Sequence, residues 1–172
     1  MSDIGTAERI LIPGSWRLDY SHAAGRAASR FLVALRDEGR ILASPCPRCG
    51  RVRVPPRSFC EDCFVRTSDD WVEVGPGGVV EAYTVTRAEF PGYPPPPHAL
   101  AYVRLDGAGT AMANFVEGLD LEGDRPPLAI GDRVRAVFAP DRQGRIRDFH
   151  FEPEPGARGV PETSGARGVP ET

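Results

Sequence analysis

The sequence predicts a mainly β protein with an N-terminal helix, a small cysteine-bound ribbon and a five-stranded barrel. Three observations support this prediction. Helix-forming residues precede a cluster of four cysteines, the cysteines have metal-ligand spacing, and the chain after them alternates between apolar and polar residues. The expected parts are residues 1–40, 41–74 and 75–154, followed by a tail at 155–172.

Composition narrows the class of protein. The chain has 172 residues, of which 41% are hydrophobic, and a net charge of −3. No apolar run approaches the roughly 20 residues of a membrane helix, and the first residues lack a secretory signal pattern. We therefore expect a cytoplasmic protein that binds no membrane. All 21 basic residues are arginine, so this chain has no lysine for Schiff-base catalysis.

The predicted helix covers residues 23–38, "AAGRAASRFLVALRDE", and Gly39 is suited to end it. Its apolar residues Phe31, Leu32 and Leu35 share one face. This face either packs on the chain's own domain or docks a partner protein. The three residues are therefore candidates for a partner interface.

All four cysteines lie in the pattern C-x₂-C-x₁₀-C-x₂-C, and Gly50 directly follows the second of them. Two intervening residues let one tight turn direct two thiolates at one ion, and glycine suits the left-handed turn that follows. The spacing favours a metal over a redox pair or disulfides, with zinc expected and iron as the alternative. Four protein ligands close the site to water, which makes the metal structural. The predicted ligands of one zinc ion are Cys46, Cys49, Cys60 and Cys63.

Five short segments after residue 78 alternate with the period of a strand. They are residues 79–87, 99–105, 110–117, 132–138 and 145–151. Such short strands favour a small closed barrel over a sandwich. The connection "FPGYPPPPH" contains four consecutive prolines, which make a stiff loop with few hydrogen bonds. This loop is either a spacer or a preorganised wall for a ligand or partner.

The sequence contains no recognisable catalytic constellation. His22, His98 and His150 stand at no motif spacing, and phosphate loops and nucleophile elbows are absent from the sequence. His98 ends the proline loop and is either structural or part of a site. Arginines around the cysteines form either a solvated surface or a phosphate site; they are Arg48, Arg51, Arg53, Arg57 and Arg66.

The tail repeats "GARGVPET" at residues 156–163 and 165–172. It has almost no apolar side chains to bury, so we expect it to be disordered on its own.

From about Arg30 to Glu152 the chain resembles the acyl-CoA-associated proteins called domain of unknown function thirty-five. The resemblance rests on "RFLVALRDEGRILASPCPRCGRVRVPPRSFCEDC", "VVEAYTVTR", "HALAYVRLDGAGTAMANFVEG" and "LAIGDRVRAVF". It implies a rubredoxin-like zinc ribbon followed by an OB-fold barrel, with one zinc ion on the four cysteines.

The resemblance also implies a function. Members of the family bind thiolase-like enzymes through the helix and ribbon, and the OB-fold helps to hold the coenzyme A moiety of the substrate. Some of these complexes are retro-aldolases that cleave a carbon–carbon bond of a steroid acyl-CoA. By resemblance, this chain is a non-catalytic subunit of a thiolase-like acyltransferase or aldolase in steroid or lipid side-chain degradation. We expect two copies on a thiolase-like dimer, with Arg57, Phe90 and Tyr93 as candidate coenzyme contacts.

Two other functions are alternatives. Zinc ribbons and OB-folds also bind single-stranded nucleic acid through aromatic platforms and a basic groove. The net charge of −3 and the few strand aromatics, Tyr83, Tyr102 and Phe115, argue against this interpretation. An independent enzyme has the least support, because no catalytic constellation is visible.

Overall fold

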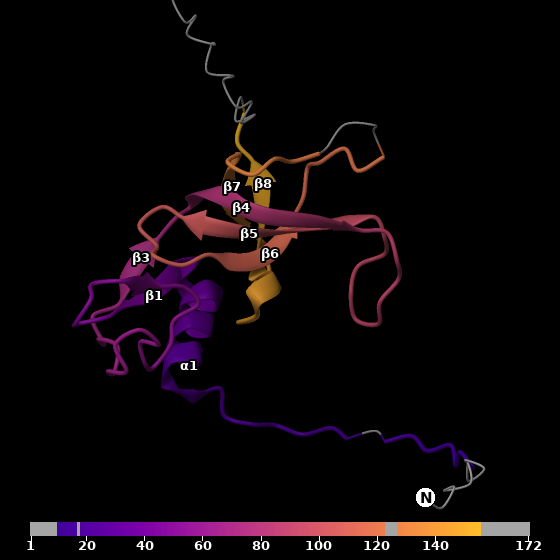
Figure 1. Ribbon diagram of the computed structural model, residues 1–172, viewed down its shortest axis with the longest axis horizontal. Coiled ribbons are helices and arrows are strands. Elements are labelled where there is room, and N and C mark those ends of the chain that lie inside the picture. The colour runs from indigo at the N-terminus through magenta and orange to yellow at the C-terminus, as the bar shows by residue number, and fades with distance from the viewer. Residues whose placement is uncertain (1–9, 17, 123–126, 156–172) are drawn as a thin grey trace, which may run out of the picture.

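The computed structural model describes residues 10–16, 18–122 and 127–155. The repeated tail lies outside these residues. Figure 1 shows the helix and ribbon on one side of the barrel, with the N-terminal segment extending away from both. The proline loop projects from the opposite side of the barrel.

The helix forms where the sequence predicts it. It consists of α1 (Gly25–Val33), which continues into the π-helical turn η1 (Ala34–Glu38). Gly39 ends the helix in the left-handed region, with a φ of 62°.

The apolar face of the helix packs inward, which corrects the expected docking face. Phe31 is 2% exposed and Leu35 is 0% exposed, and both belong to the main hydrophobic core with Ile41. Leu32 is half-buried against the same core. Because this chain already buries Phe31 and Leu35, their side chains present no surface to a partner.

Three short strands form the sheet of the ribbon. They are β1 (Ile41–Pro45), β2 (Val52–Arg53) and β3 (Val72–Val74), antiparallel in the order β2-β1-β3. The ribbon is fastened to the barrel, since Thr110 Oγ1 exchanges two 2.9 Å hydrogen bonds with the backbone of Val54. The amide of Gly109 also donates to the carbonyl of Val52 at 2.7 Å.

The predicted five-stranded barrel is present and closed, in the order β4-β5-β6-β8-β7. Its strands are β4 (Gly77–Thr86), β5 (His98–Leu105), β6 (Met112–Val116), β7 (Arg133–Phe138) and β8 (Phe149–Pro153). The last strand starts later than predicted, because Ile146–Asp148 form the 3-10 turn η2. The Asp148 carboxylate accepts hydrogen bonds from the amides of Gln143, Gly144 and Arg145, which favours a turn there.

A glycine at the start of β4 is required by close packing. A Cβ atom added to Gly78 would lie 2.6 Å from Cγ1 of Val103 and 2.9 Å from the carbonyl oxygen of Arg104. The glycines of "GPGG" therefore lie between the ribbon and the barrel and also let β4 approach β5.

Across the described residues, no helix has the length and apolar character needed to cross a membrane.

The inward position of the helix leads to a stability prediction. Leu35→Ala should lower the free energy of unfolding by about 2–5 kcal/mol, because it leaves a cavity in the core. Urea unfolding followed by circular dichroism measures the change. Val33→Ala, on the exposed side of the same helix, is the control and should change stability by no more than about 0.5 kcal/mol. Equal midpoints for Leu35→Ala and the unmodified chain would contradict the packing.

Candidate metal centre and ligand pocket

The four cysteines converge on one point. Their Sγ atoms all lie within 4.8 Å of one another. The Sγ atoms of Cys49 and Cys60 are 3.8 Å apart, which matches two sulfurs bound at about 2.3 Å to one tetrahedral zinc ion. The cluster therefore fits a single zinc ion with no open coordination position.

Two similar turns position these thiols. In the first turn the amide of Gly50 donates to the carbonyl of Cys46 at 2.9 Å, and in the second Phe64 donates to Cys60 at 2.9 Å. Gly50 and Phe64 both have positive φ, at 70° and 55°. Each turn thus directs one pair of thiols at the shared centre.

Arg53 is buried beside the cluster and is only 1% exposed. Its Nη2 donates to Sγ of Cys60 at 3.2 Å and to the carboxylate of Asp62 at 2.8 Å, and its Nη1 pairs with Glu61. Four thiolates around Zn²⁺ carry a net charge of −2, and a guanidinium at this distance offsets part of it. Arg53 therefore supports the thiolate cluster through hydrogen bonds without being a metal ligand itself.

The thiols differ in acidity. Burial disfavours the thiolate of Cys60, but hydrogen bonds from Arg53 and from the backbone of Cys63 and Asp62 lower its pKa to about 6. Burial and the neighbouring thiols raise the pKa of Cys63 to about 12. Since zinc binds thiolates, its binding drives the remaining protons off the cluster.

Three of the five arginines around the ribbon are paired with acidic side chains. Arg51 pairs with Asp62 at 2.8 Å, and Arg57 pairs with Glu61 at 3.2 Å. These contacts favour a solvated surface over a phosphate site. Arg57 belongs to the ribbon, whereas the other two candidate coenzyme contacts, Phe90 and Tyr93, lie in the loop between β4 and β5, so the three are not grouped.

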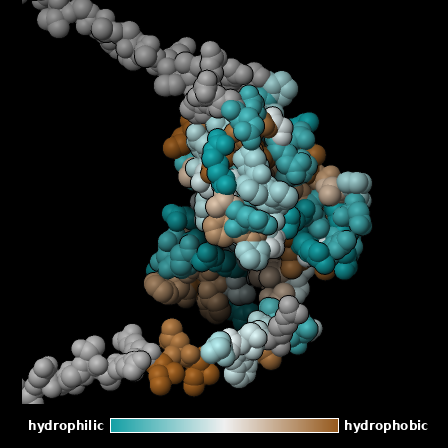
Figure 2. Space-filling view, turned by 90° about the vertical axis from the view of Figure 1, so that its right-hand side faces the viewer, coloured by the Kyte–Doolittle hydropathy of each residue, from teal (hydrophilic) through white to brown (hydrophobic). Residues whose placement is uncertain are grey.

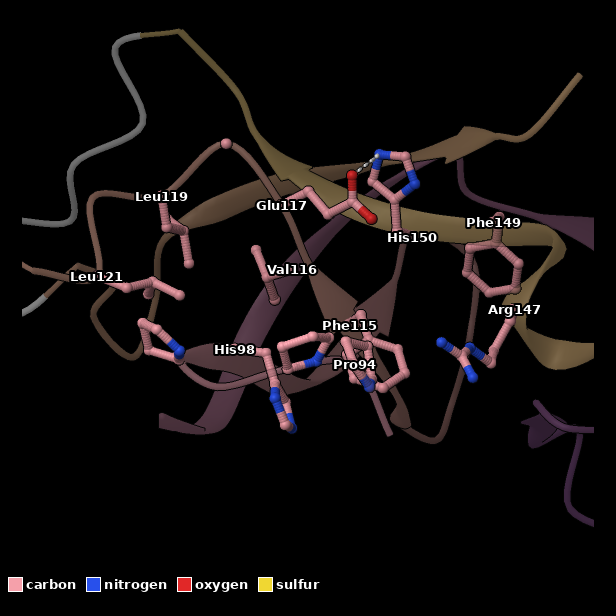
Figure 3. A pocket seen from close by; sticks show the side chains of 13 residues that line it. Pro94, His98, Phe115, Val116, Glu117, Leu119, Leu121, Arg147, Phe149 and His150 are labelled. Carbon is pink, nitrogen blue, oxygen red and sulfur yellow. Dashed lines mark ion pairs between the residues drawn. The ribbon is translucent and has the colours of Figure 1, made fainter. Parts of the chain in front are cut away.

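A pocket of about 420 Å³ lies under the proline loop (Figure 3). Its walls come from the loop, β5, β6, the following turn and β8, and they include Pro94, His98, Phe115, Leu121, Arg147 and His150. In chain order, β5 and β6 are the second and third strands of the barrel. Residues 87–97 join the first two strands, and residues 139–148 join the last two. OB-folds bind their ligands on the face that these strands and loops form.

Aromatic rings surround His98 at one end of the pocket. The ring of Tyr93 stacks on His98 with centroids 6.0 Å apart, and Phe115 meets it edge-on at 5.6 Å. Phe90 contacts Tyr93 at 6.4 Å. The structure therefore brings the candidate coenzyme contact Tyr93 beside His98 and places Phe90 next to Tyr93, but neither of the two lines the pocket itself. His98 is 7% exposed, and neither ring nitrogen has a hydrogen-bond partner within the described chain.

Sequence reasoning missed Arg147, which supplies a positive charge to the pocket. Its guanidinium lies 5.3 Å from the centroid of the Phe115 ring, and its Nη1 donates to the carbonyl of Gly92 at 3.3 Å. Asn114 holds the same turn by donating to the carbonyls of Ile146 and Phe149. The only signal in the sequence was an aspartate after a glycine turn, "DRQGRIRD", which is weak by itself.

At the far wall, His150 lies 3.7 Å from the carboxylate of Glu117 and 3.4 Å from that of Glu152. Figure 3 shows the pair of His150 and Glu117 facing each other at the top of the pocket. His150 is therefore held by acids and is not simply a solvated strand residue. His22 lies in the N-terminal segment, away from both sites, and contacts Tyr20.

Arg53 allows a test of the metal site. Arg53→Met should lower zinc affinity roughly 10–100-fold, because the thiolate cluster loses its charged hydrogen-bond donor. Competition with a chromogenic chelator measures this affinity. Arg51→Met is the matched control, since Arg51 also pairs with Asp62 but is half exposed. The assignment fails if both variants bind zinc as tightly as the unmodified chain.

Asp148 provides a test of the turn that carries Arg147. Burial opposes its charge, but the backbone amides of Gln143, Arg145 and Gly144 outweigh burial and lower its pKa. Because the pKa of Asp148 is lower in the folded chain, its carboxylate stabilises the fold at pH values above its pKa in the unfolded chain, which is near 3.9. This stabilisation is lost as the pH falls through the pKa of Asp148 in the folded chain. Asp148→Asn should therefore reduce the melting temperature most near neutral pH, with a smaller difference below about pH 4.

Thermal unfolding from pH 3 to 7 measures this difference. Asp141→Asn, in the same loop but exposed, is the control and should follow the unmodified chain at each pH. A constant difference for Asp148→Asn at every pH would show that the carboxylate charge does not hold the turn.

Comparison with known proteins identifies the two domains. Residues 33–69 match the model of the ChsH2 rubredoxin-like zinc ribbon domain, and residues 71–139 match that of the ChsH2 C-terminal OB-fold domain. The two models together span more than half of the chain. No curated protein matches it.

Two solved structures share the fold. One is described as an Ltp2-ChsH2(DUF35) aldolase, with 23% identity over 77% of this chain and 98% of that chain, and a TM-score of 0.54. The other is a DUF35-family protein of unknown function from Sulfolobus solfataricus, with 23% identity over 76% of this chain and 87% of that chain, and a TM-score of 0.56. Since both domain models match in order along one chain that also has four converging cysteines, the protein belongs to the ChsH2 (DUF35) family of zinc-ribbon and OB-fold proteins.

Proposed function

We propose that this chain is a zinc-binding accessory subunit that associates with a thiolase-like enzyme chain and helps to hold its acyl-CoA substrate. The observation that carries the proposal is the pocket on the ligand face of the barrel, where aromatic rings and Arg147 meet. A similar chain belongs to a structure described as an Ltp2-ChsH2 aldolase, which supports a role in carbon–carbon bond cleavage.

The pocket suits the chemistry of coenzyme A. The adenine base of coenzyme A is flat. Tyr93, which is 54% exposed and stacks on the pocket residue His98, offers a ring beside the pocket on which such a base can stack. Arg147 offers a guanidinium for the phosphates. Tyr93 stacks on the ring of His98, whose two nitrogens have no hydrogen-bond partner among the described residues. A ligand that displaced Tyr93 could therefore form hydrogen bonds with these nitrogens, because a neutral imidazole has one donor and one acceptor.

The bond-cleaving step is assigned to the partner. The four thiols of this chain are the donors for zinc, and the sequence has no lysine. Neither a thiol nor an amine nucleophile is therefore available here. We place the complex in steroid or lipid side-chain degradation in the cytoplasm, by a retro-aldol or thiolytic reaction, with two copies of each chain.

The alternative, a single-stranded nucleic-acid-binding module, has less support. Binding of that kind needs a basic groove, whereas Arg51, Arg53 and Arg57 of the ribbon are paired with acids and the net charge is −3.

The first test uses the chain co-expressed with the thiolase-like protein of its host. Native mass spectrometry should give a two-plus-two complex with one zinc ion for each copy of this chain. Calorimetric titration of that complex with coenzyme A should then show binding about tenfold weaker for Tyr93→Ala and for Arg147→Gln, as expected when a stacking or charged contact is lost.

Tyr102→Ala is the control, because Tyr102 is an equally exposed tyrosine that lies on β5 and not in the proline loop beside His98. Unchanged coenzyme binding by both Tyr93→Ala and Arg147→Gln would exclude this site. Separate elution of the two chains would exclude the accessory role, and tight binding of an oligothymidine at low salt would favour the alternative.

A further inference from the structure

One buried side chain of the barrel has no hydrogen-bond partner. Both ring nitrogens of His98 are shielded from solvent, and within the described residues neither meets a donor or an acceptor. His98 is 7% exposed and begins β5 directly after the proline loop. A buried polar group without a partner costs free energy, so its presence in a folded chain requires an explanation. An apolar ring at this position would be less costly for the fold alone.

His98 is a wall residue of the pocket of about 420 Å³. The other polar side chains of this wall already have partners. His150 faces Glu117 at 3.7 Å on the opposite side of the pocket (Figure 3), and Arg147 donates to the carbonyl of Gly92 at 3.3 Å. The pocket therefore offers a ligand one unused donor and one unused acceptor at His98.

Tyr93 covers these nitrogens. Its ring is nearly parallel to the ring of His98, with 18° between the two planes and 6.0 Å between the centroids. Tyr93 is 54% exposed and lies in the loop between β4 and β5, so it is less tightly packed than His98. If Tyr93 moves outward, a flat group can reach His98 and still have the tyrosine ring stacked on its own face.

The surroundings of the proline loop favour a small ligand over a protein. Figure 2 looks onto the side from which this loop projects in Figure 1, and it shows mostly pale and teal residues there without a broad hydrophobic patch. Broad exposed apolar patches mark protein-docking sites. Here the apolar side chains line the pocket instead, among them Phe115, Val116 and Leu121. Small molecules bind in pockets of this kind, which combine apolar walls with a few polar groups.

The proposed function indicates which end of coenzyme A reaches His98. The bond-cleaving step is assigned to the partner, so the thioester end of the ligand extends into that chain and the nucleotide end stays with this one. Adenine has flat faces, and its edge carries an amino donor next to ring-nitrogen acceptors. This edge can satisfy an imidazole nitrogen in either tautomer, because it accepts as well as donates.

We infer that His98 recognises the adenine base of coenzyme A by hydrogen bonding to its edge, after Tyr93 has moved off the imidazole to stack on the face of the base. The inference rests on the proposed function and assigns selectivity for the base to one residue of β5. His98 and Arg147 both contact the ring of Phe115, at 5.6 Å and 5.3 Å. One nucleotide can therefore place its base at His98 and its phosphates at Arg147.

The decisive variant is His98→Phe, which keeps a flat ring and removes both nitrogens. In the complex with the thiolase-like chain, its affinity for coenzyme A should fall about tenfold in a calorimetric titration, as expected for one lost hydrogen bond. The unliganded full chain should melt at the same or a higher temperature, because a buried polar group without a partner has been removed. A purely structural histidine would give the opposite pattern, with a lower melting temperature and unchanged affinity.

Two further variants serve as controls. His98→Gln keeps one donor group and one acceptor, so it should retain most of the affinity for coenzyme A. His22→Phe is the same substitution at an exposed histidine of the N-terminal segment, and it should change neither the affinity nor the melting temperature.

An altered coenzyme tests the contact from the side of the ligand. In etheno-coenzyme A, a two-carbon bridge blocks the amino group and the neighbouring ring nitrogen of adenine. The unmodified complex should bind this analogue about tenfold more weakly than coenzyme A, because the hydrogen bond to His98 is lost. The His98→Phe complex should bind the two compounds equally.

The outcomes separate this inference from the proposed function. If the His98→Phe complex binds coenzyme A fully and still prefers it to the etheno analogue, the inference is wrong and the proposed function stands. The same conclusion follows if His98→Phe only lowers the melting temperature. If the unmodified complex binds no coenzyme A, both the inference and the proposed role in holding the substrate are wrong.

Discussion

The convergence of four thiols is the constraint on which the rest of the structure depends. The sheet of the ribbon has only three short strands, so it is too small to be held by burial alone. Bound metal would close both turns at once, and Arg53 balances the charge next to it. Because Val52 and Val54 also bond to Gly109 and Thr110, order in the ribbon is transmitted to the barrel.

The small size of the ribbon also decides the role of the helix. The strand β1 is buried along most of its length, and two ribbon strands cannot cover it alone. Phe31 and Leu35 complete that core together with barrel residues such as Val80. The helix is consequently a structural element of this core.

The pocket depends on two loops that are restrained by different means. Four prolines stiffen one loop, and the buried carboxylate of Asp148 fixes the other. Arg147 joins them through its contacts with Gly92 and Phe115. A site restrained in this way loses less conformational entropy when a ligand binds. The pocket is therefore preorganised, and the proline loop that forms part of its wall projects from the side of the barrel opposite the ribbon (Figure 1).

Local patterns in the sequence determined the zinc ligands, the helix with its stop at Gly39 and the approximate positions of five strands, because spacing and periodicity act over a few residues. Tertiary structure alone decided that Phe31 and Leu35 face inward, that β8 begins only at Phe149, and that Arg51, Arg53 and Arg57 of the ribbon are paired with acids. It also decided that Arg147, His98 and Phe115 meet around one pocket, with Tyr93 stacked on His98. These outcomes depend on contacts between residues far apart in the chain. The local sequence does not show which distant element an apolar helix face will pack against, or which acid an arginine will pair with.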